Sequence, residues 1–176
     1  LLPDLVVPMS EHRTFKYFKE ETLEKYAAQY GWTLIDDSNR KDLFLDMIRQ
    51  MDMSYSYKPV LIKAILLYAD DKGHIKLDDI VSYFRSYYEG RRTAGLVVEK
   101  KNSIFAKGGY TDKEAERNIL ANPFKRFEDM QMLRHTKTLG IVQVDDAVWK
   151  KLTKEEKAEI EQICDQKLAD YFKRMV

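Results

Sequence analysis

The sequence has only one cysteine among its 176 residues, so no disulfide bond can form within the chain. A reducing, cytoplasmic setting is therefore the expected localisation. The chain also lacks an apolar run as long as a membrane span, and its N-terminus lacks the charged head and apolar core of a secretion signal. No membrane partner is expected. The sequence shows neither internal repeats nor low-complexity segments.

A large excess of one charge is absent as well. There are 30 lysines and arginines against 29 aspartates and glutamates, a net charge of +1. This balance argues against coating of nucleic acid by the whole surface, although it leaves room for a local basic patch. No G-x-x-x-x-G-K-S/T loop occurs, so the chain itself is not expected to bind or hydrolyse ATP. The overall composition is that of an ordinary globular protein, 44% hydrophobic and 34% charged.

The beginning of the chain has no helix start signal. It opens at Leu1 rather than at methionine, and the run LLPDLVVP contains Pro3 and Pro8, which discourage a helix. We therefore expect a fragment of a longer protein, in which residues 1–9 are a linker from an upstream domain.

Residues 10–53 are predicted to form an N-terminal annex of two helices. Ser10 can cap a helix that runs to Tyr30 and is stopped by Gly31. A second helix is expected over residues 40–51, with apolar side chains on one side. This annex is short for a domain that folds alone, so it should pack on the rest of the chain.

Two helices joined by a tight polar turn organise the next stretch. The first, over residues 58–69, is apolar almost all round and should be buried on most sides. Residues 70–73 end it, an extended piece over 74–77 comes next, and Asp78 is a plausible N-cap for the second helix. The second helix carries an apolar face at helical spacing, formed by Ile80, Val81, Phe84, Tyr87 and Tyr88.

The rest of the chain predicts short elements and one long helix. They are a strand over 96–98, a helix over 111–121, a short helix over 123–130, a hairpin over 131–144 and a final helix that begins at 153. Ile104 and Phe105 should be anchored inward. Helices followed by a two-stranded hairpin are typical of a winged-helix domain. The expected fold is mainly α with a small β-hairpin: a winged-helix-like domain over residues 54–176, with its C-terminal helix, plus the annex. A generic small helical domain with an incidental hairpin is the alternative.

Four segments carry a resemblance to a known family. They are SYSYKPVLIKAIL, GHIKLDDIVSYFRSYYEGRR, NPFKRFEDMQMLRH and a Val-Asp-Asp-x-x-Trp-x-x-Leu tail. Together they resemble the C-terminal accessory region of bacterial DEAD/DEAH-type helicases and restriction-enzyme-like proteins, from Ser54 to the end of the chain. The resemblance implies a DNA-processing or restriction-modification setting. It also implies an ATP-dependent motor upstream in the same protein, outside this chain, as a partner. It implies no cofactor and no catalytic residue in the chain itself.

Eight cations are the candidates for contact with nucleic acid: Arg91, Arg92, Lys100, Lys101, Lys125, Arg126, Arg134 and Lys137. A winged helix would present its third helix and its wing to DNA. Lys125, Arg126, Arg134 and Lys137 are therefore the expected phosphate contacts. The competing interpretation is a solvated surface, because single charge pairs are common on protein surfaces.

A module that contacts protein and never touches DNA is the first alternative function. Near-zero net charge favours it, as does a helix face rich in tyrosine. The tyrosines in question are Tyr55, Tyr57, Tyr83, Tyr87 and Tyr88. They could stack on bases, but their helical spacing favours packing in a core or an interface.

A Mg²⁺-dependent nuclease is the second alternative. Glu99 and Lys101 form a Glu-x-Lys motif after an apolar run, with Asp78 and Asp79 about 20 residues upstream. Capping of a helix explains both aspartates without a metal. The nuclease hypothesis requires Glu99, Lys101 and an aspartate to converge in space.

No other metal site is predicted. The three histidines are scattered without metal-binding spacing, and a calcium-like run over residues 70–79 has Lys72 where an oxygen ligand is needed. Cys164 falls on the buried face of the last helix and should pack there.

Overall fold

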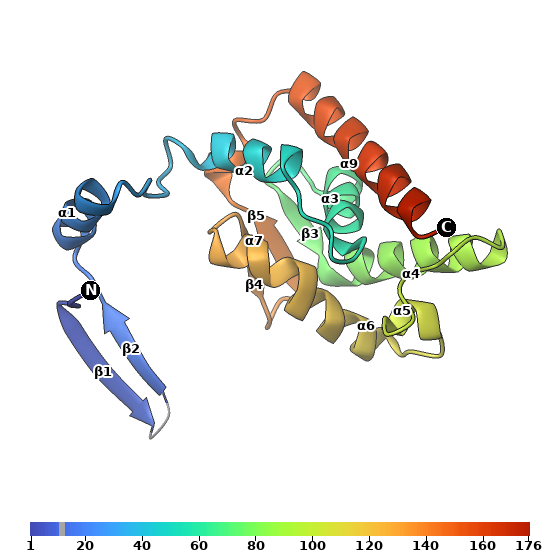
Figure 1. The fold of residues 1–176 in the computed structure, drawn as a ribbon, viewed down its shortest axis with the longest axis horizontal. Coiled ribbons are helices and arrows are strands. Elements are labelled where there is room, and N and C mark those ends of the chain that lie inside the picture. Colours follow the sequence, from blue (N-terminus) through green and yellow to red (C-terminus); the bar gives the residue numbers. More distant parts are fainter. Residues whose placement is uncertain (11–12) are drawn as a thin grey trace. The chain divides into compact units, whose positions relative to one another are not determined.

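The computed structural model describes residues 1–10 and 13–176 (Figure 1). The chain divides into two compact units, residues 1–36 and residues 37–176, and each is described by itself. Both are built from helices with small antiparallel sheets, so the prediction of a mainly α protein with a little β structure is confirmed. None of the helices in the described part of the chain combines the length and apolar character that a membrane crossing requires.

The first unit is a β-hairpin followed by one helix. Strand β1 (Leu5–Ser10) pairs antiparallel with β2 (Arg13–Tyr17), with Leu5 opposite Tyr17. Helix α1 (Glu20–Tyr30) ends at Gly31, which has a φ of 68°. Gly31 stops this helix as predicted, because glycine adopts the left-handed conformation without steric cost.

Two expectations for the start of the chain are wrong. Residues 1–9 are not only a linker, and no helix begins at Ser10, because residues 5–10 and 13–17 form strands. Val6 and Val7 are β-branched and favour an extended backbone, which outweighs a single capping serine. The part of the predicted helix over residues 11–12 lies outside the described residues.

The two-helix annex is also not a unit. Helix α2 (Arg40–Arg49) belongs to the second unit, where it buries Phe44, Leu45 and Ile48. It packs on the short helix α8 (Asp146–Trp149) and on the long helix α9 (Lys154–Arg174). The boundary therefore lies between residues 36 and 37, because the apolar face of α2 finds its partners more than 90 residues further along the chain.

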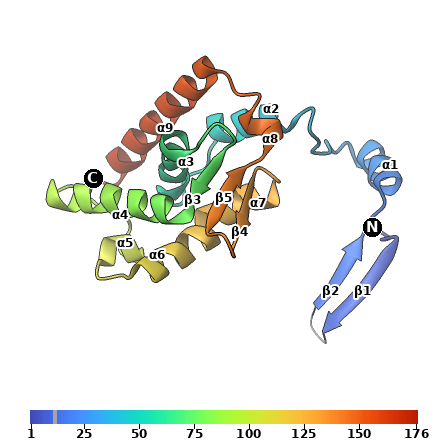
Figure 2. The same cartoon turned by 180° about the vertical axis from the view of Figure 1, so that it is seen from behind.

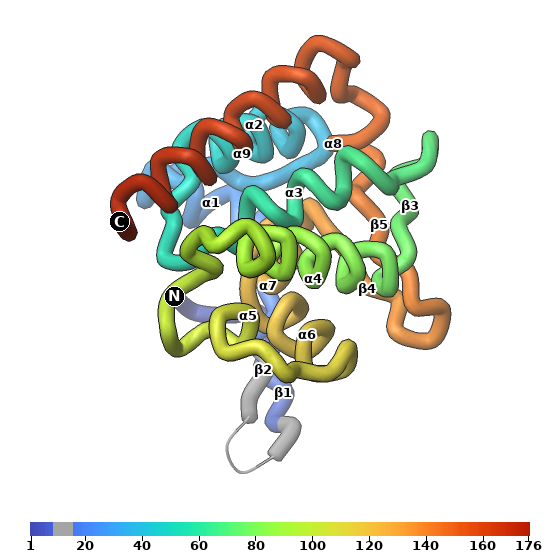
Figure 3. Tube along the Cα trace, turned by 90° about the vertical axis from the view of Figure 1, so that its right-hand side faces the viewer, coloured from blue at the N-terminus to red at the C-terminus, as the bar shows by residue number. Residues whose placement is uncertain are grey.

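Helix α3 (Tyr57–Tyr68) is the centre of the second unit. It packs against α9 and against α4 (Leu77–Thr93), and Figures 1 and 3 show it lying between them. Its first three turns are almost entirely buried. This burial on most sides is what its continuous apolar sequence predicts.

A three-stranded antiparallel sheet closes one side of the second unit (Figure 2). Strand β3 (His74–Lys76) lies beside β5 (Ile141–Val144), and β5 lies beside β4 (Leu133–Thr136). Strands β4 and β5 form the predicted hairpin, with Leu133 opposite Val144. The strand predicted over residues 96–98 does not form, and this segment is irregular.

Short helical elements connect α4 to the hairpin. They are α5 (Ile104–Lys107), α6 (Asp112–Ile119), the π-turn η1 (Leu120–Phe124) and α7 (Lys125–Asp129). Asn122 has extended backbone angles, which produces the predicted break before Pro123. Thr111 caps α6, and Thr153 forms a full capping box with Glu156 at the start of α9, as predicted.

Gly73 lies where the turn after α3 meets Trp149. Its φ is 78°, and a Cβ placed there would lie 3.0 Å from Cγ of Trp149. We expect Gly73→Ala to lower the free energy of unfolding by about 2–3 kcal/mol, the sum of a left-handed backbone cost and a steric cost. Gly95→Ala is the matched control, because Gly95 has a φ of 72° with nothing within 4 Å of the added atom. It should lose only about 1 kcal/mol in urea denaturation. Equal losses would contradict a contact with Trp149.

Candidate nucleic-acid interface

The eight predicted cations fall into two groups. The helix–hairpin group consists of Lys125, Arg126, Arg134 and Lys137, on α7 and on the β4–β5 hairpin. The helix-end group consists of Arg91, Arg92, Lys100 and Lys101, at the C-terminal end of α4 and in the turn beyond it. The structure does not bring all eight into one surface, and the two groups have different surroundings.

Half of the helix–hairpin group is already neutralised. The Lys125 ammonium lies 2.6 Å from the Asp129 carboxylate, and the hydrogen bond to Asp129 raises the pKa of Lys125. The Arg134 guanidinium lies 3.1 Å from Asp145. Within residues 1–10 and 13–176, no carboxylate lies within 4.0 Å of the charged nitrogens of Arg126 or Lys137. These two cations are therefore the ones that can pair with a phosphate without first losing an internal partner.

The Asp145 side chain is fixed by contacts within the protein. Its side chain accepts a hydrogen bond from the Ala147 amide at 2.9 Å and caps α8. It also pairs at 3.0 Å with the buried guanidinium of Arg40, which reaches Asp37 at 2.6 Å. The pairing of Arg134 with Asp145 thus belongs to a structural cluster, at a polar cavity of about 640 Å³ beside β4.

Helix α6, which precedes α7, is not basic. It carries three acidic side chains and two basic ones: Asp112, Glu114, Glu116, Lys113 and Arg117. Asp112 also pairs with Arg85 on α4 at 3.1 Å. A helix with this balance gives little attraction to a phosphate backbone.

Three of the four cations in the helix-end group are held by contacts within the second unit, and one of them, Arg91, contacts the C-terminal end of α9. The Arg91 guanidinium lies 3.4 Å from the centre of the Phe172 ring, and its Nε donates to the Val97 carbonyl. Arg92 donates to the Phe105 carbonyl at 2.6 Å. The Lys100 ammonium donates to the Ser54 carbonyl and lies 5.2 Å from the Tyr55 ring. These contacts hold in place the irregular segment after α4, which includes the residues that were expected to form a strand.

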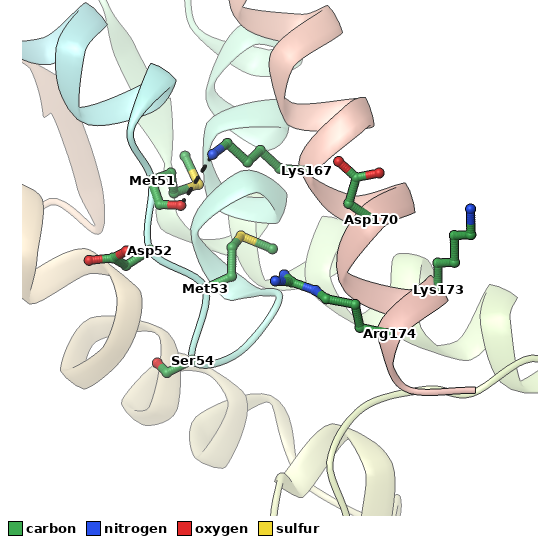
Figure 4. Close-up of a pocket in the computed structure, with 8 residues that line it drawn as sticks. All are labelled: Met51, Asp52, Met53, Ser54, Lys167, Asp170, Lys173 and Arg174. Atoms are coloured by element: carbon green, nitrogen blue, oxygen red, sulfur yellow. Dashed lines mark hydrogen bonds between the residues drawn. The ribbon is translucent and has the colours of Figure 1, made fainter.

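Sequence reasoning missed three further cations near this end: Lys167, Lys173 and Arg174. They line a cavity of about 760 Å³ between α9 and the segment Met51–Ser54 (Figure 4). Lys167, Asp170 and Arg174 are spaced three and four residues apart, so they share one face of the helix. The spacing of these residues is visible in the sequence and indicates a shared helix face. Only the fold shows that the segment before α3 lies opposite this face of α9.

Glu99 has a structural role that the nuclease hypothesis does not allow for. Its side chain is buried and accepts hydrogen bonds from the Ser56 amide at 2.8 Å, the Lys100 amide at 2.7 Å and the hydroxyls of Ser56 and Tyr171. Burial, and then the hydrogen bond to Glu99, raise the pKa of Tyr171. Both carboxylate oxygens are occupied by protein donors, so Glu99 is not placed to bind a metal ion.

The other parts of the nuclease hypothesis do not converge on Glu99. Asp78 and Asp79 lie in the first turn of α4. In the described part of the chain, no group of three or more His, Cys, Asp or Glu side chains could hold a metal ion. The geometry therefore gives the nuclease interpretation no support.

The tyrosines behave largely as core residues. Tyr57 and Tyr88 are buried, and burial raises the pKa of Tyr57 to about 12. Tyr55 stacks on Tyr57 with ring centres 4.8 Å apart. Cys164 is buried on α9 as predicted, and burial raises the pKa of its thiol to about 12.

Comparisons with protein-family models, with curated proteins and with solved structures found no match for this chain. The resemblance to a helicase accessory region therefore stays a prediction.

Proposed function

We propose that residues 37–176 form a winged-helix-like, non-catalytic accessory domain of a DNA-processing protein of the helicase or restriction type. In this proposal the domain positions DNA through contacts to the phosphate backbone. The ATP-dependent motor is expected upstream in the same protein. Phosphate contacts fix the position of a protein on DNA and carry no sequence information directly, so little sequence preference is expected.

The order of the elements is the observation that carries this proposal. A helix, a short strand, a helix, further helices and a hairpin succeed one another as α3, β3, α4, α6–α7 and β4–β5. The first short strand pairs with the last strand of the hairpin, which gives the sheet order β3-β5-β4. This order supports the winged-helix interpretation, in which the hairpin would be the wing and the helix before it would face DNA.

Within this arrangement, Arg126 and Lys137 are the best-placed phosphate contacts. Arg126 lies on α7, Lys137 lies in the turn of the hairpin, and both side chains are exposed. Lys125 and Arg134 would have to exchange an internal carboxylate for a phosphate, so each is expected to contribute less to the free energy of DNA binding.

Docking on the motor without DNA contact is the second candidate function. The ion pairs of Lys125 and Arg134 and the acidic character of α6 favour it, because they reduce the attraction of this face for a polyanion. The two candidates differ in one measurable property, which is salt-sensitive binding to duplex DNA.

The double variant Arg126→Ala/Lys137→Ala tests the DNA function. We expect about tenfold weaker binding to a labelled duplex and a salt dependence reduced by about 2 in slope, one for each lost phosphate contact. Fluorescence anisotropy across a salt series measures both quantities. Lys125→Ala is the matched control on the same helix and should have a smaller effect, because its ammonium is already paired.

No binding of the wild-type chain to duplex DNA at low salt would overturn the proposed DNA contact. It would leave docking on the motor as the better explanation of the same fold.

A further inference from the structure

Three lysine side chains from three different elements converge on one short segment of backbone. Lys167 of α9 donates to the Met51 carbonyl at 3.4 Å, and Lys58 of α3 donates to the Asp52 carbonyl at 2.9 Å. Lys100 donates to the Ser54 carbonyl. Of the three, Lys167 lines the cavity on the α9 side of this segment, and because an ammonium has three N–H donors, its contact with Met51 leaves further donors for a ligand.

The cavity on the α9 side of this segment is lined by additional positive charge. Lys173 and Arg174 line it together with Lys167, and Figure 4 shows Lys167 and Arg174 reaching toward the segment. Two carboxylates also belong to the lining. Asp52 is directed away from α9, and Asp170 accepts a hydrogen bond from the Gln166 amide at 2.9 Å. The lining therefore carries three cations, Lys167, Lys173 and Arg174, against two carboxylates, a net charge of +1.

Compensation of the helix dipole does not explain this arrangement fully. Lys173 and Arg174 lie in the last turn of α9, where cations are favourable in any helix. Lys167 lies two turns earlier, and Lys58 and Lys100 belong to other elements, so a dipole effect of α9 does not account for their positions.

We propose that the cavity between α9 and residues 51–54 binds phosphate groups of a single-stranded nucleic-acid backbone. Ammonium and guanidinium groups are pure donors with positive charge, which is the chemistry that recognises phosphate. A volume of about 760 Å³ is larger than one phosphate needs. Arg91, which lies over Phe172 of α9, and Lys100, which donates to the carbonyl of Ser54 in the cavity lining, add positive charge beside it. The inference rests on the proposed DNA-positioning function and gives it a second contact site, next to the cavity that Arg126 of α7 lines with Met51, Asp52 and Lys58.

The double variant Lys173→Gln/Arg174→Gln of the full chain tests this site. Both side chains are exposed, so the fold should survive, which circular dichroism can verify. We expect about tenfold weaker binding to a labelled single-stranded DNA oligonucleotide and a salt slope reduced by about 1.4, because single strands release about 0.7 counterion per contact. Lys150→Gln/Lys154→Gln removes two exposed lysines near the other end of α9 and should bind as the wild type does.

The outcomes separate this inference from the proposed function. Unchanged oligonucleotide binding by Lys173→Gln/Arg174→Gln would overturn the cavity site, while a loss of duplex binding by Arg126→Ala/Lys137→Ala would still support the winged-helix function. The opposite result would support the cavity site and remove the contact through α7 and the hairpin. Binding of the chain to phosphatidylserine vesicles but not to the oligonucleotide would overturn the site as a nucleic-acid site.

Discussion

Replacing Glu99 by alanine is expected to lower the free energy of unfolding of residues 37–176 by about 3–5 kcal/mol. The carboxylate accepts hydrogen bonds from the amides of Ser56 and Lys100 and from the hydroxyls of Ser56 and Tyr171. Glu99, Ser56 and Tyr171 are all buried, so the donors left behind on the last two would find no water to replace the lost acceptor. A buried donor without a partner costs about 1–3 kcal/mol, and alanine would leave several.

Urea denaturation followed by far-ultraviolet circular dichroism measures this loss. Glu114→Ala is the control, because Glu114 is exposed on α6 and makes no contact across the core. A loss below about 1 kcal/mol for Glu99→Ala would mean that water reaches the site. It would also return Glu99 to consideration as a metal ligand.

A double-mutant cycle can show that the network acts as one unit. Tyr171→Phe removes one donor to Glu99 and leaves the ring in place. Combined with Glu99→Gln, it should give a coupling energy of about 1–3 kcal/mol, because the two residues share one hydrogen-bond network. Additive losses would indicate that the two side chains stabilise the fold independently.

The role of Glu99 shows why part of the site could not be predicted from the sequence. Its partners Ser56 and Tyr171 lie 43 and 72 residues away along the chain. The local pattern places Glu99 after an apolar run and beside lysines, which suggests a catalytic motif. Only the packing of α9 against α3 brings Tyr171 to this carboxylate and shows that its oxygens are already used.

Elements with strong local signals can be predicted well. Thr111 and Thr153 cap α6 and α9 as predicted, with the full capping box formed at Thr153, and the apolar run that becomes α3 is buried as expected. In contrast, the paired strands of residues 5–10 and 13–17 are not predicted when a single capping residue is given more weight than its β-branched neighbours. The ion pair of Lys125 with Asp129 follows from the local pattern, and the ion pair of Arg134 with Asp145 does not. Asp129 is one turn from Lys125, but Asp145 reaches Arg134 only because the hairpin folds back.

The aromatic cluster under the irregular segment after α4 is the second place where a large effect is expected. Phe105 has no exposed surface, and its ring stacks on Tyr88 with centres 4.6 Å apart. It also makes edge contacts with Tyr57 at 5.6 Å and Tyr110 at 5.0 Å. The prediction that Phe105 is anchored inward is confirmed, and this ring joins α3, α4 and the segment that carries Glu99.

We therefore expect Phe105→Ala to destabilise residues 37–176 by about 3–5 kcal/mol, through lost apolar burial and the cavity left behind. Thermal unfolding should show a melting temperature lower by about 10 °C or more. Leu139→Ala is the control, because Leu139 is 69% exposed in the hairpin turn. It should change stability by no more than about 0.5 kcal/mol.

The Phe105→Ala variant also tests whether binding at each of the two proposed sites depends on the packing of the segment after α4. The Phe105 carbonyl accepts the hydrogen bond that holds Arg92, and the segment between them carries Lys100 and Lys101. At a temperature where Phe105→Ala remains folded, we expect weaker binding to the single-stranded oligonucleotide and little change at α7 and the hairpin. Equal losses of binding at both sites would show instead that the variant destabilises the packing of the whole second unit. Unchanged oligonucleotide binding would mean that the cations after α4 do not extend the cavity on α9.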